Sequence, residues 1–447
     1  MDVSEIFQGL NERQREAVTH PARAMRVIAG AGSGKTRVLV QRMQWLMAVE
    51  GVSPYGLLAL TFTNKAAREM GERVRALLGK EARGLHISTF HRLGLDILQK
   101  EHLAAGLRRN FTVFDARDGA TLVKELSKQE DEAMVRQLQA QISAYKNANI
   151  SAAAAKTLAQ DEAQVLAAHI YHHYDQRLRA YNAVDFDDLI ALPLALLREH
   201  EAVRERWQHR VRYLLVDEYQ DTNHAQYALV RELVGAHPQG NTREQGPYPD
   251  APPPGELTVV GDSDQSIYAF RGADIRNITD FESDYPNAHI ILLEQNYRST
   301  QNILSAANAV IERNPNRRPK KLWTASGEGT KIVGYVAESE HAEARYIAQE
   351  IDRLADEHGI KPSDVAIFYR TNAQSRALEE LLMRAGLPYR VVGGTRFYER
   401  KEIKDALAYL RALSNPDDDV SVRRILNEPK RGIGAKSETV VADYASA

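Results

Sequence analysis

Residues 29–37, Ala-Gly-Ala-Gly-Ser-Gly-Lys-Thr-Arg, combine three glycines with a lysine and a hydroxyl side chain, a set suited to binding phosphate. Glycine reaches positive φ and lets a ligand approach the backbone, so the N–H groups of such a loop can surround phosphate oxygens. Lys35 would reach the β- and γ-phosphates of a nucleotide, and the Thr36 hydroxyl would ligate Mg²⁺. The general pattern has glycine where this chain has Ala29, so a glycine-rich turn with a surface lysine is the alternative.

The elements on either side of this loop favour the phosphate site. The apolar residues 27–29 predict a short buried strand before it. Val38, Leu39 and Met43 have helical spacing and predict a helix after it. The loop would then lie at a helix N-terminus, where backbone N–H groups and the helix dipole attract an anion.

Two carboxylates follow a second apolar run, residues 213–216. Asp217 is placed to hold Mg²⁺, directly or through water, and Glu218 is placed to orient and deprotonate an attacking water. A strand that ends in acidic residues is common, so Asp217 and Glu218 indicate a catalytic site only in combination with a phosphate loop. Gln265 follows another predicted strand, residues 256–260, and could sense a γ-phosphate.

Strands and helices alternate at short spacing on both sides of a helical stretch. A predicted strand at 57–63 and a predicted strand followed by a helix within 86–93 precede that stretch, and the strands at 213–216 and 256–260 follow it. This alternation predicts an α/β fold with a parallel sheet covered on both faces, whose ligands bind beyond the carboxyl ends of the strands. Residues 115–210 show helical spacing with few strand signals and predict an all-helical insertion.

Aromatic and small polar side chains are expected at the same strand ends. Such a mixture suits the stacking of bases of single-stranded nucleic acid. The alternative is that these aromatic side chains pack into the core. The candidates are Phe62, Thr63, Asn64, Phe90 and His91 after the early strands, and Tyr268, Phe270 and Arg271 after the strand at 256–260.

The second half of the chain predicts a further sheet and helices. The basic run 313–321 is typical of a solvated surface rather than a binding patch. Residues 237–255 contain six of the sixteen prolines and predict a mobile surface loop. We expect the strands of the further sheet at 289–293, 331–336, 365–369 and 389–392, and a helical pattern at 401–413.

Length and composition describe an ordinary globular chain. Its 447 residues suit two to four domains, and the net charge of −2 means that any nucleic-acid site is a local groove. The absence of cysteine excludes disulfides and a thiol nucleophile. No apolar run approaches the roughly 18 residues that span a bilayer. With an acidic N-terminus that lacks an apolar signal core, we expect a cytoplasmic protein without membrane contact.

Together these stretches resemble the motif series of superfamily 1 DNA helicases, in particular the UvrD/PcrA/Rep branch. The resemblance covers essentially all 447 residues, and it accounts for Ala29, because the family's loop has alanine at that position. The markers are Leu10–Gln14, Gly30–Arg37, Thr61–Ala67, Ser88–His91, Asp217–Asp221, Gly261–Tyr268, Leu293–Thr300 and Gly393–Lys404.

The resemblance implies two RecA-like, P-loop parallel-sheet motor domains, each with an inserted accessory domain. ATP would bind in the cleft between the motors, and single-stranded DNA would run across their tops. We expect the first RecA-like ATPase domain at 1–110 and 211–290, a helical accessory insertion at 111–210, an incomplete second RecA-like domain at 291–391, and the start of a truncated second accessory domain at 392–447.

The resemblance also assigns the nucleotide site. Gln14 would read the adenine edge, while Arg37 and Tyr297 sandwich the ring, and Lys35 and Thr36 hold the phosphates and Mg²⁺. The full ATP-binding set comprises Gln14, Ala29, Gly30, Ala31, Gly32, Ser33, Gly34, Lys35, Thr36, Arg37, Tyr297 and Arg298.

The same resemblance assigns catalytic and DNA-binding roles. Asp217 would be the metal partner and Glu218 the catalytic base. Gln265 and Arg298 would touch the γ-phosphate, Arg298 as an arginine finger from the second motor. The residues lining the DNA path would be Phe62, Thr63, Asn64, His91, Tyr268, Phe270 and Arg271.

The implied function is a Mg²⁺- and ATP-dependent 3′→5′ translocase and helicase of the DNA-repair type. It would act on single-stranded DNA and on junctions with duplex, as a monomer or weak dimer, with DNA repair proteins as candidate partners. Two alternatives are a fragment that binds ATP and single-stranded DNA without turnover, and the motor half of a helicase-nuclease. No stretch after residue 400 resembles nuclease carboxylates.

Two departures from the family pattern bear on these expectations. Many relatives have tryptophan where this chain has Phe270, which still stacks but has less π surface. The family's Thr-x-His-x-x-Lys-Gly segment and its Val-Gly-(Leu/Val)-Thr-Arg segment, which bears the other arginine finger, do not occur here. We therefore expect a truncated chain, and the missing finger could lower hydrolysis by ~10³–10⁵-fold.

Overall fold

The computed structural model describes residues 6–235, 254–279, 281–314, 317, 319–392, 401–434, 437 and 440. Most of the proline-rich loop expected at 237–255 lies outside these residues, as does the first part of the motif at 393–404. No helix within the described ranges is both long and apolar enough to cross a membrane.

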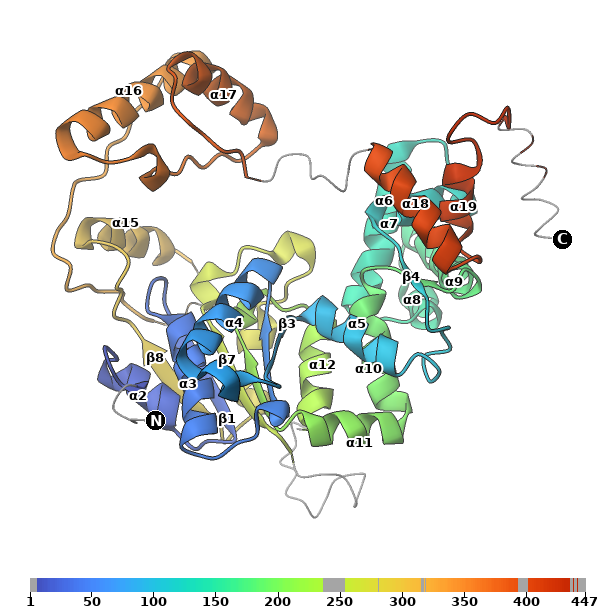
Figure 1. Cartoon of the computed structure of the whole chain (residues 1–447), viewed down its shortest axis with the longest axis horizontal. Helices are drawn as coiled ribbons and strands as arrows, with labels where there is room; N and C mark the ends of the chain where they lie inside the picture. Colours follow the sequence, from blue (N-terminus) through green and yellow to red (C-terminus); the bar gives the residue numbers. More distant parts are fainter. Residues whose placement is uncertain are drawn as a thin grey trace.

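A single parallel sheet organises the first half of the molecule (Figure 1). Its six strands lie in the order β3-β2-β6-β7-β1-β8. They are β1 Ala24–Ala29, β2 Leu57–Thr61, β3 His86–Thr89, β6 Tyr213–Val216, β7 Glu256–Gly261 and β8 His289–Leu293. The central strands are almost wholly buried, as expected for a parallel sheet covered on both faces. The predicted α/β class is confirmed.

Strand β8 corrects one prediction. It does not begin another sheet, because it pairs in parallel with β1, from Met25 opposite His289 to Ala29 opposite Leu293. Ile291 and Leu293 are buried in the same apolar cluster as Val27 of β1, so the shared core holds β8 at this edge.

Two layers of helices cover the sheet, each with its own apolar cluster. On one face lie α2 Glu12–Thr19, α3 Lys35–Ala48 and α4 Asn64–Leu78. The other face packs against α5 Phe90–Lys100, α10 Asp188–Glu199, α11 Glu201–Arg210, α12 His224–Val234 and the short helices α13 Arg276–Thr279 and α14 Phe281–Asp284. Asn11 caps α2, because its side chain accepts from the Gln14 N–H.

A helical insertion with its own core rises between α5 and α10. Its helices are α6 Ala116–Ser127, α7 Glu132–Asn147, α8 Ala152–Leu158 and α9 Glu162–Ala180. At its base, β4 Thr112–Val113 pairs in parallel with β5 Ala183–Val184, so the chain enters and leaves the insertion side by side. The helical character expected for 115–210 is present, although α10 and α11 pack on the sheet.

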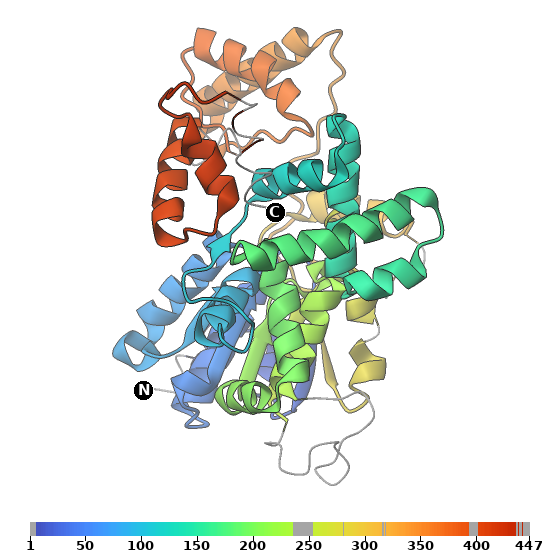
Figure 2. The same cartoon turned by 90° about the vertical axis from the view of Figure 1, so that its right-hand side faces the viewer.

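The last helices return to this insertion. They follow α15 Gln301–Ile311, α16 Glu340–His358 and α17 Ser375–Arg384, and comprise α18 Lys401–Ser414 and α19 Asp419–Leu426. Figures 1 and 2 show α18 and α19 beside α6. Ion pairs join them, with Lys404 Nζ 2.7 Å from Asp115 and Arg423 Nη1 2.8 Å from Glu125. The helical pattern predicted at 401–413 is confirmed.

Three predicted strands in the second half are wrong. Residues 331–336, 365–369 and 389–392 form no strand in the described part of the chain. Val336 is 95% exposed and Phe368 is 94% exposed, so neither side chain packs into a core. Apolar composition favours extended backbone, but a strand also needs a neighbouring strand to bond with.

Gly94 offers a test of the packing between α5 and α10. A Cβ there would lie 1.6 Å from the backbone oxygen of Leu189, so Gly94→Ala should force the helices apart and cost roughly 1–3 kcal/mol or more of unfolding free energy. Denaturant unfolding measures this loss. Gly71→Ala in α4 is the control, because its Cβ would meet only the Arg75 guanidinium at 3.5 Å and should gain up to ~1 kcal/mol. Equal stability of Gly94→Ala and the wild type would contradict the close approach.

Candidate functional site

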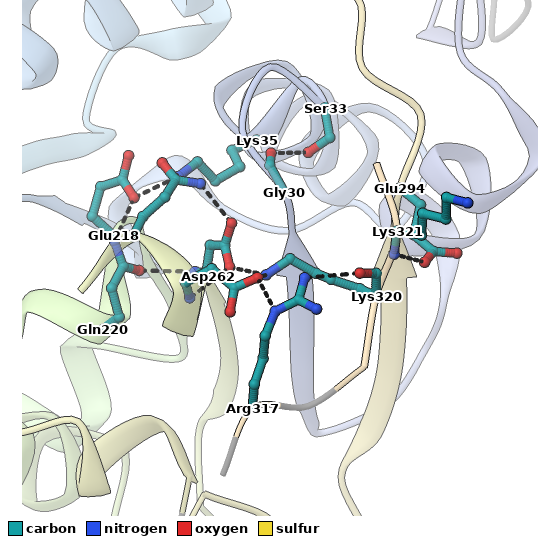
Figure 3. Close-up of polar contacts among 12 residues, drawn as sticks. Gly30, Ser33, Lys35, Glu218, Gln220, Asp262, Glu294, Arg317, Lys320 and Lys321 are labelled. Carbon is teal, nitrogen blue, oxygen red and sulfur yellow. Dashed lines mark hydrogen bonds and ion pairs between the residues drawn. The ribbon is translucent and has the colours of Figure 1, made fainter. Parts of the chain in front are cut away.

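The glycine loop joins β1 to α3 in the conformation that its sequence predicts. Gly32 and Gly34 have φ of +66° and +85°, values that favour glycine. The Ser33 hydroxyl donates to the Gly30 carbonyl at 2.7 Å, which closes the loop (Figure 3). Helix α3 begins at Lys35, so its first backbone N–H groups are available to an anion.

Lys35 brings together residues from three strand ends. Its Nζ lies 2.6 Å from Glu218 Oε2 and 3.3 Å from Gln265 Oε1 (Figure 3). Gln220 Nε2 donates to the same Glu218 oxygen at 2.9 Å, and Glu218 adopts a φ of +49°. Lys35 therefore contacts two of the other three predicted catalytic residues.

Asp217 is a buried carboxylate whose charge is only partly compensated. Burial raises its pKa to about 6, and the charge of Glu218 adds to the shift, while Lys35 opposes it. A divalent cation would relieve this cost, and oxygen ligands suit Mg²⁺. Thr36 is half-buried in the first turn of α3. The donor chemistry of Thr36 and Asp217 thus fits the predicted ion.

The predicted adenine-binding residues surround the same loop. Gln14 is only 1% exposed, and its Nε2 donates to the Ser33 carbonyl at 2.8 Å. Asn11, which caps the helix of Gln14, donates from Nδ2 to the Tyr297 hydroxyl at 2.8 Å. Arg37 is exposed and donates to a backbone carbonyl near the N-terminus. Gln14 therefore supports the loop directly.

A buried asparagine that the sequence reading left without a role fastens the next segment to the loop. Asn296 Nδ2 donates to the Ala31 carbonyl at 2.5 Å, and its Oδ1 accepts from the Arg298 N–H at 2.8 Å. The backbone N–H of Tyr297 donates to the Gly32 carbonyl at 2.9 Å. Arg298 is thereby placed beside the phosphate loop, with its side chain exposed. The signal in the sequence was the position of Asn296 inside the motif Leu293–Thr300.

His91, in the first turn of α5, stacks on an aromatic ring that the sequence had not indicated. Phe186 lies with its ring centroid 4.0 Å from that of His91, and it is 56% exposed. Burial lowers the pKa of His91 to about 4, so this ring is neutral at pH 7 and offers a stacking surface rather than charge. The signal in the sequence for Phe186 was an aromatic residue among three aspartates, at positions 185, 187 and 188.

The turn that carries Phe186 leads into α10. This helix begins at Asp188, and Asp185 Oδ1 accepts from the Asp188 N–H at 2.8 Å. Lys146 Nζ of α7 lies 2.8 Å from Asp185 and 2.7 Å from Asp188. Burial lowers the pKa of Lys146, but the surrounding carboxylates raise it well above its ordinary value. The charged cluster thus fixes the turn against the insertion.

The remaining predicted DNA-binding residues lie at the expected strand ends. Phe90 is buried in the core, so the alternative interpretation holds for it. Thr63 caps α4, because its Oγ1 accepts from the Ala66 N–H at 3.1 Å. Two further aromatic contacts are Phe62–Phe90 at 6.1 Å and Tyr268–Phe270 at 6.0 Å between ring centroids. Asn64 is exposed after β2, and Arg271 lies in the 3₁₀ turn Ala269–Arg271.

The expectation of a solvated basic run at 313–321 is wrong for two of its residues. Arg317 Nε donates to Asp264 Oδ2 at 2.9 Å, and Lys320 Nζ lies 2.6 Å from the same oxygen (Figure 3). Lys320 also pairs with Asp262. Both basic side chains therefore point at the loop that carries Gln265.

Comparison with known families accounts for this arrangement. Residues 10–286 match the family model described as UvrD/REP helicase N-terminal domain. The chain belongs to the UvrD/REP helicase family. Residues 291–446 match a second model, UvrD-like helicase C-terminal domain. The resemblance drawn from the motif series is confirmed.

Over the aligned residues, relatives in this helicase family are about 50% identical to the chain. ATP-dependent DNA helicase UvrD1 of Mycobacterium tuberculosis is 54% identical over 449 residues, which cover 99% of this chain and 57% of the relative. ATP-dependent DNA helicase PcrA of Bacillus subtilis is 47% identical over 447 residues, 99% of this chain and 58% of the relative. The chain thus spans less than three fifths of the length of these relatives.

The raised pKa of Asp217 predicts a pH-dependent stability in this UvrD/REP-family chain. Because the folded-state pKa is about 6 against an ordinary 3.8, folding is penalised above pH 6 and the penalty disappears as the pH falls toward 4. Asp217→Asn should therefore raise the unfolding free energy at pH 8 by up to about 3 kcal/mol. Denaturant unfolding without added metal or nucleotide, at pH 8 and pH 4, measures the difference.

The control is Asp352→Asn, which changes an exposed aspartate on α16 and should stay within about 0.5 kcal/mol of the wild type at both pH values. A gain for Asp217→Asn that is the same at pH 8 and pH 4 would contradict an electrostatic origin.

Proposed function

We propose that this chain supplies the ATP-driven motor of a DNA helicase that translocates 3′→5′ on single-stranded DNA and serves DNA repair. The observation that carries the proposal is the meeting of Lys35, Glu218 and Gln265 beside Asp217 at one edge of the sheet. The names of the relatives support the same activity.

Each residue of this cluster has a chemical task in ATP hydrolysis. Lys35 binds phosphate oxygens, Glu218 accepts a proton from the attacking water, and Gln265 bonds the γ-phosphate. Arg298, beside the loop, reaches the same phosphate from the following segment. Mg²⁺ held by Thr36 and Asp217 would supply charge neutralisation on the phosphates.

The ion pair between Lys35 and Glu218 links nucleotide binding to the activity of the base. The same Nζ that would bind phosphate lies 2.6 Å from the Glu218 carboxylate. Phosphate oxygens therefore compete with Glu218 for Lys35. When phosphate oxygens bind Lys35, the Glu218 carboxylate is released to accept a proton from water.

Single-stranded DNA would cross the carboxyl ends of the strands and stack its bases on aromatic rings. Phe186 and His91 form one stacked pair, and Phe270, 71% exposed, lies near Tyr268. Stacking accepts every base, which suits a motor that moves along any sequence. Tyr268 and Phe270 follow Gln265 within one segment, so γ-phosphate and base contacts share a short stretch of backbone.

Lys35→Ala tests the ATP site. Loss of the phosphate-binding ammonium should lower DNA-stimulated ATP turnover roughly 10²–10³-fold. The assay compares wild type, Lys35→Ala and Lys124→Ala, the last a change on the surface of α6 far along the chain from the loop. Undiminished turnover of Lys35→Ala would reject this site.

Phe186→Ala tests the DNA path. The loss of one stacking surface should cost about 1–3 kcal/mol of binding, or roughly 5- to 150-fold in Kd for an oligothymidylate measured by fluorescence anisotropy. Phe186→Trp should bind nearly as the wild type. Leu103→Ala removes a side chain that is equally apolar and 82% exposed, and should have no effect. If Phe186→Ala and Leu103→Ala behave alike, Phe186 is outside the path.

A second candidate function is a module that binds ATP and single-stranded DNA without turnover. The observation in its favour is that the chain spans 57–58% of the length of these relatives. Steady-state hydrolysis by the 447-residue chain that depends on Lys35 would reject this candidate. Retained binding without hydrolysis would support it.

A further inference from the structure

The side chain of Asp262 controls the orientation of Gln265. Asp262 is 2% exposed, and its Oδ2 accepts from Gln265 Nε2 at 2.7 Å. With its nitrogen held there, the amide directs Oε1 to Lys35, 3.3 Å away. The backbone N–H of Asp262 in turn donates to Gln220 Oε1 at 3.0 Å. The orientation of the γ-phosphate reader therefore depends on where the Asp262 carboxylate is held.

Lys320 occupies the other oxygen of this carboxylate. Its side chain is 3% exposed, and Nζ pairs with Asp262 Oδ1 and lies 2.6 Å from Asp264 Oδ2. Arg317 Nε donates to the same Asp264 oxygen at 2.9 Å, and its Nη2 donates to the Lys320 carbonyl at 2.8 Å (Figure 3). Two cations and two carboxylates thus balance in a largely buried cluster, where an unmatched charge would be costly.

The cluster joins two parts of the chain. Asp262, Asp264 and Gln265 lie within residues 10–286, which match the N-terminal helicase model, whereas Arg317 and Lys320 follow α15 within residues 291–446, which match the C-terminal model. A buried lysine from one part therefore holds a carboxylate in the other.

We propose that Lys320 is a positioning residue for ATP hydrolysis, which fixes the amide of Gln265 through the Asp262 carboxylate. The proposal rests on the proposed role of Gln265 at the γ-phosphate. It assigns the basic run at 313–321 a function inside the motor. It also makes the γ-phosphate contact sensitive to the position of the segment that follows α15.

Lys320→Met tests this role in the 447-residue chain. The readout is the ratio of the Kd values for ADP and ATPγS, measured with Mg²⁺ by competition against a fluorescent nucleotide. Since Gln265 would touch only the γ-phosphate, Lys320→Met should leave the affinity for ADP unchanged and reduce the preference for ATPγS by roughly tenfold, and Gln265→Ala should reduce it to the same extent. Lys321→Met is the matched control, because that neighbouring side chain is exposed.

A double-mutant cycle separates positioning from general stability. If Lys320 acts through Gln265, the variant Lys320→Met/Gln265→Ala should lose no more preference than either single variant. Equal losses of affinity for ADP and ATPγS would instead show a structural role and overturn the proposal. So would additive losses of preference in the double variant.

A charge-balanced variant guards against misfolding. Lys320→Met/Asp264→Asn removes one charge of each sign and leaves Arg317 beside the neutralised residue, with Asp262 as the remaining carboxylate. It should keep the loss of preference, because the Lys320–Asp262 contact is still absent. A restored preference would overturn the proposal, since charge balance alone would then suffice.

The outcomes also distinguish the proposed role of Gln265 from the proposed role of Lys320. If Gln265→Ala keeps the full preference for ATPγS, the proposed role of Gln265 is wrong. If Gln265→Ala loses the preference and Lys320→Met keeps it, Gln265 reads the γ-phosphate and only the positioning by Lys320 is rejected.

Discussion

Parallel pairing of six strands is the constraint on which the site depends. Because all six strands run in one direction, their carboxyl ends meet at one edge of the sheet. Lys35, Glu218 and Gln265 each follow a different strand, and 183 residues separate the first two in sequence. They meet because β1 pairs with β7 and β7 pairs with β6 in register. The short loop at each strand end then needs only to present one side chain to the site.

Three largely buried lysines are matched by carboxylates, two of them, Lys35 and Lys320, at this edge of the sheet and the third, Lys146, in the helical insertion. Lys35 faces Glu218, Lys320 faces Asp262 and its neighbour, and Lys146 faces three aspartates. Such matching holds side chains in place before a ligand arrives, which lowers the cost of reorganisation during the reaction. Asp217 is the contrasting case, since burial outweighs the nearby Lys35 and raises its pKa. The uncompensated charge of the Asp217 carboxylate lies where the proposed ATP hydrolysis would require a divalent cation.

Local signals in the sequence predicted the nucleotide side of the site, because its parts depend on short-range physics. Positive φ at Gly32 and Gly34, and a loop between strand and helix, can be read from adjacent residues. Contacts across the fold could not be read in this way. Lys320 sits in a run that resembles a solvated surface, and only its pairing with Asp262 distinguishes it. The strand at 289–293 was assigned to the wrong sheet, because apolar composition does not specify a partner.

The segment that carries the proposed phosphate reader, Gln265, and the proposed base-stacking rings of Tyr268 and Phe270 is held at its two ends. At its start, the Asp262 carboxylate bonds Gln265 and Lys320. At its far end, Asn277 Nδ2 donates to the Thr222 carbonyl at 2.8 Å. Because buried contacts restrain both ends, a shift of Gln265 must be taken up between them, where Tyr268 and Phe270 lie. If Gln265 contacts the γ-phosphate and the two rings stack on DNA bases, this short span would connect the nucleotide contact with the DNA contact.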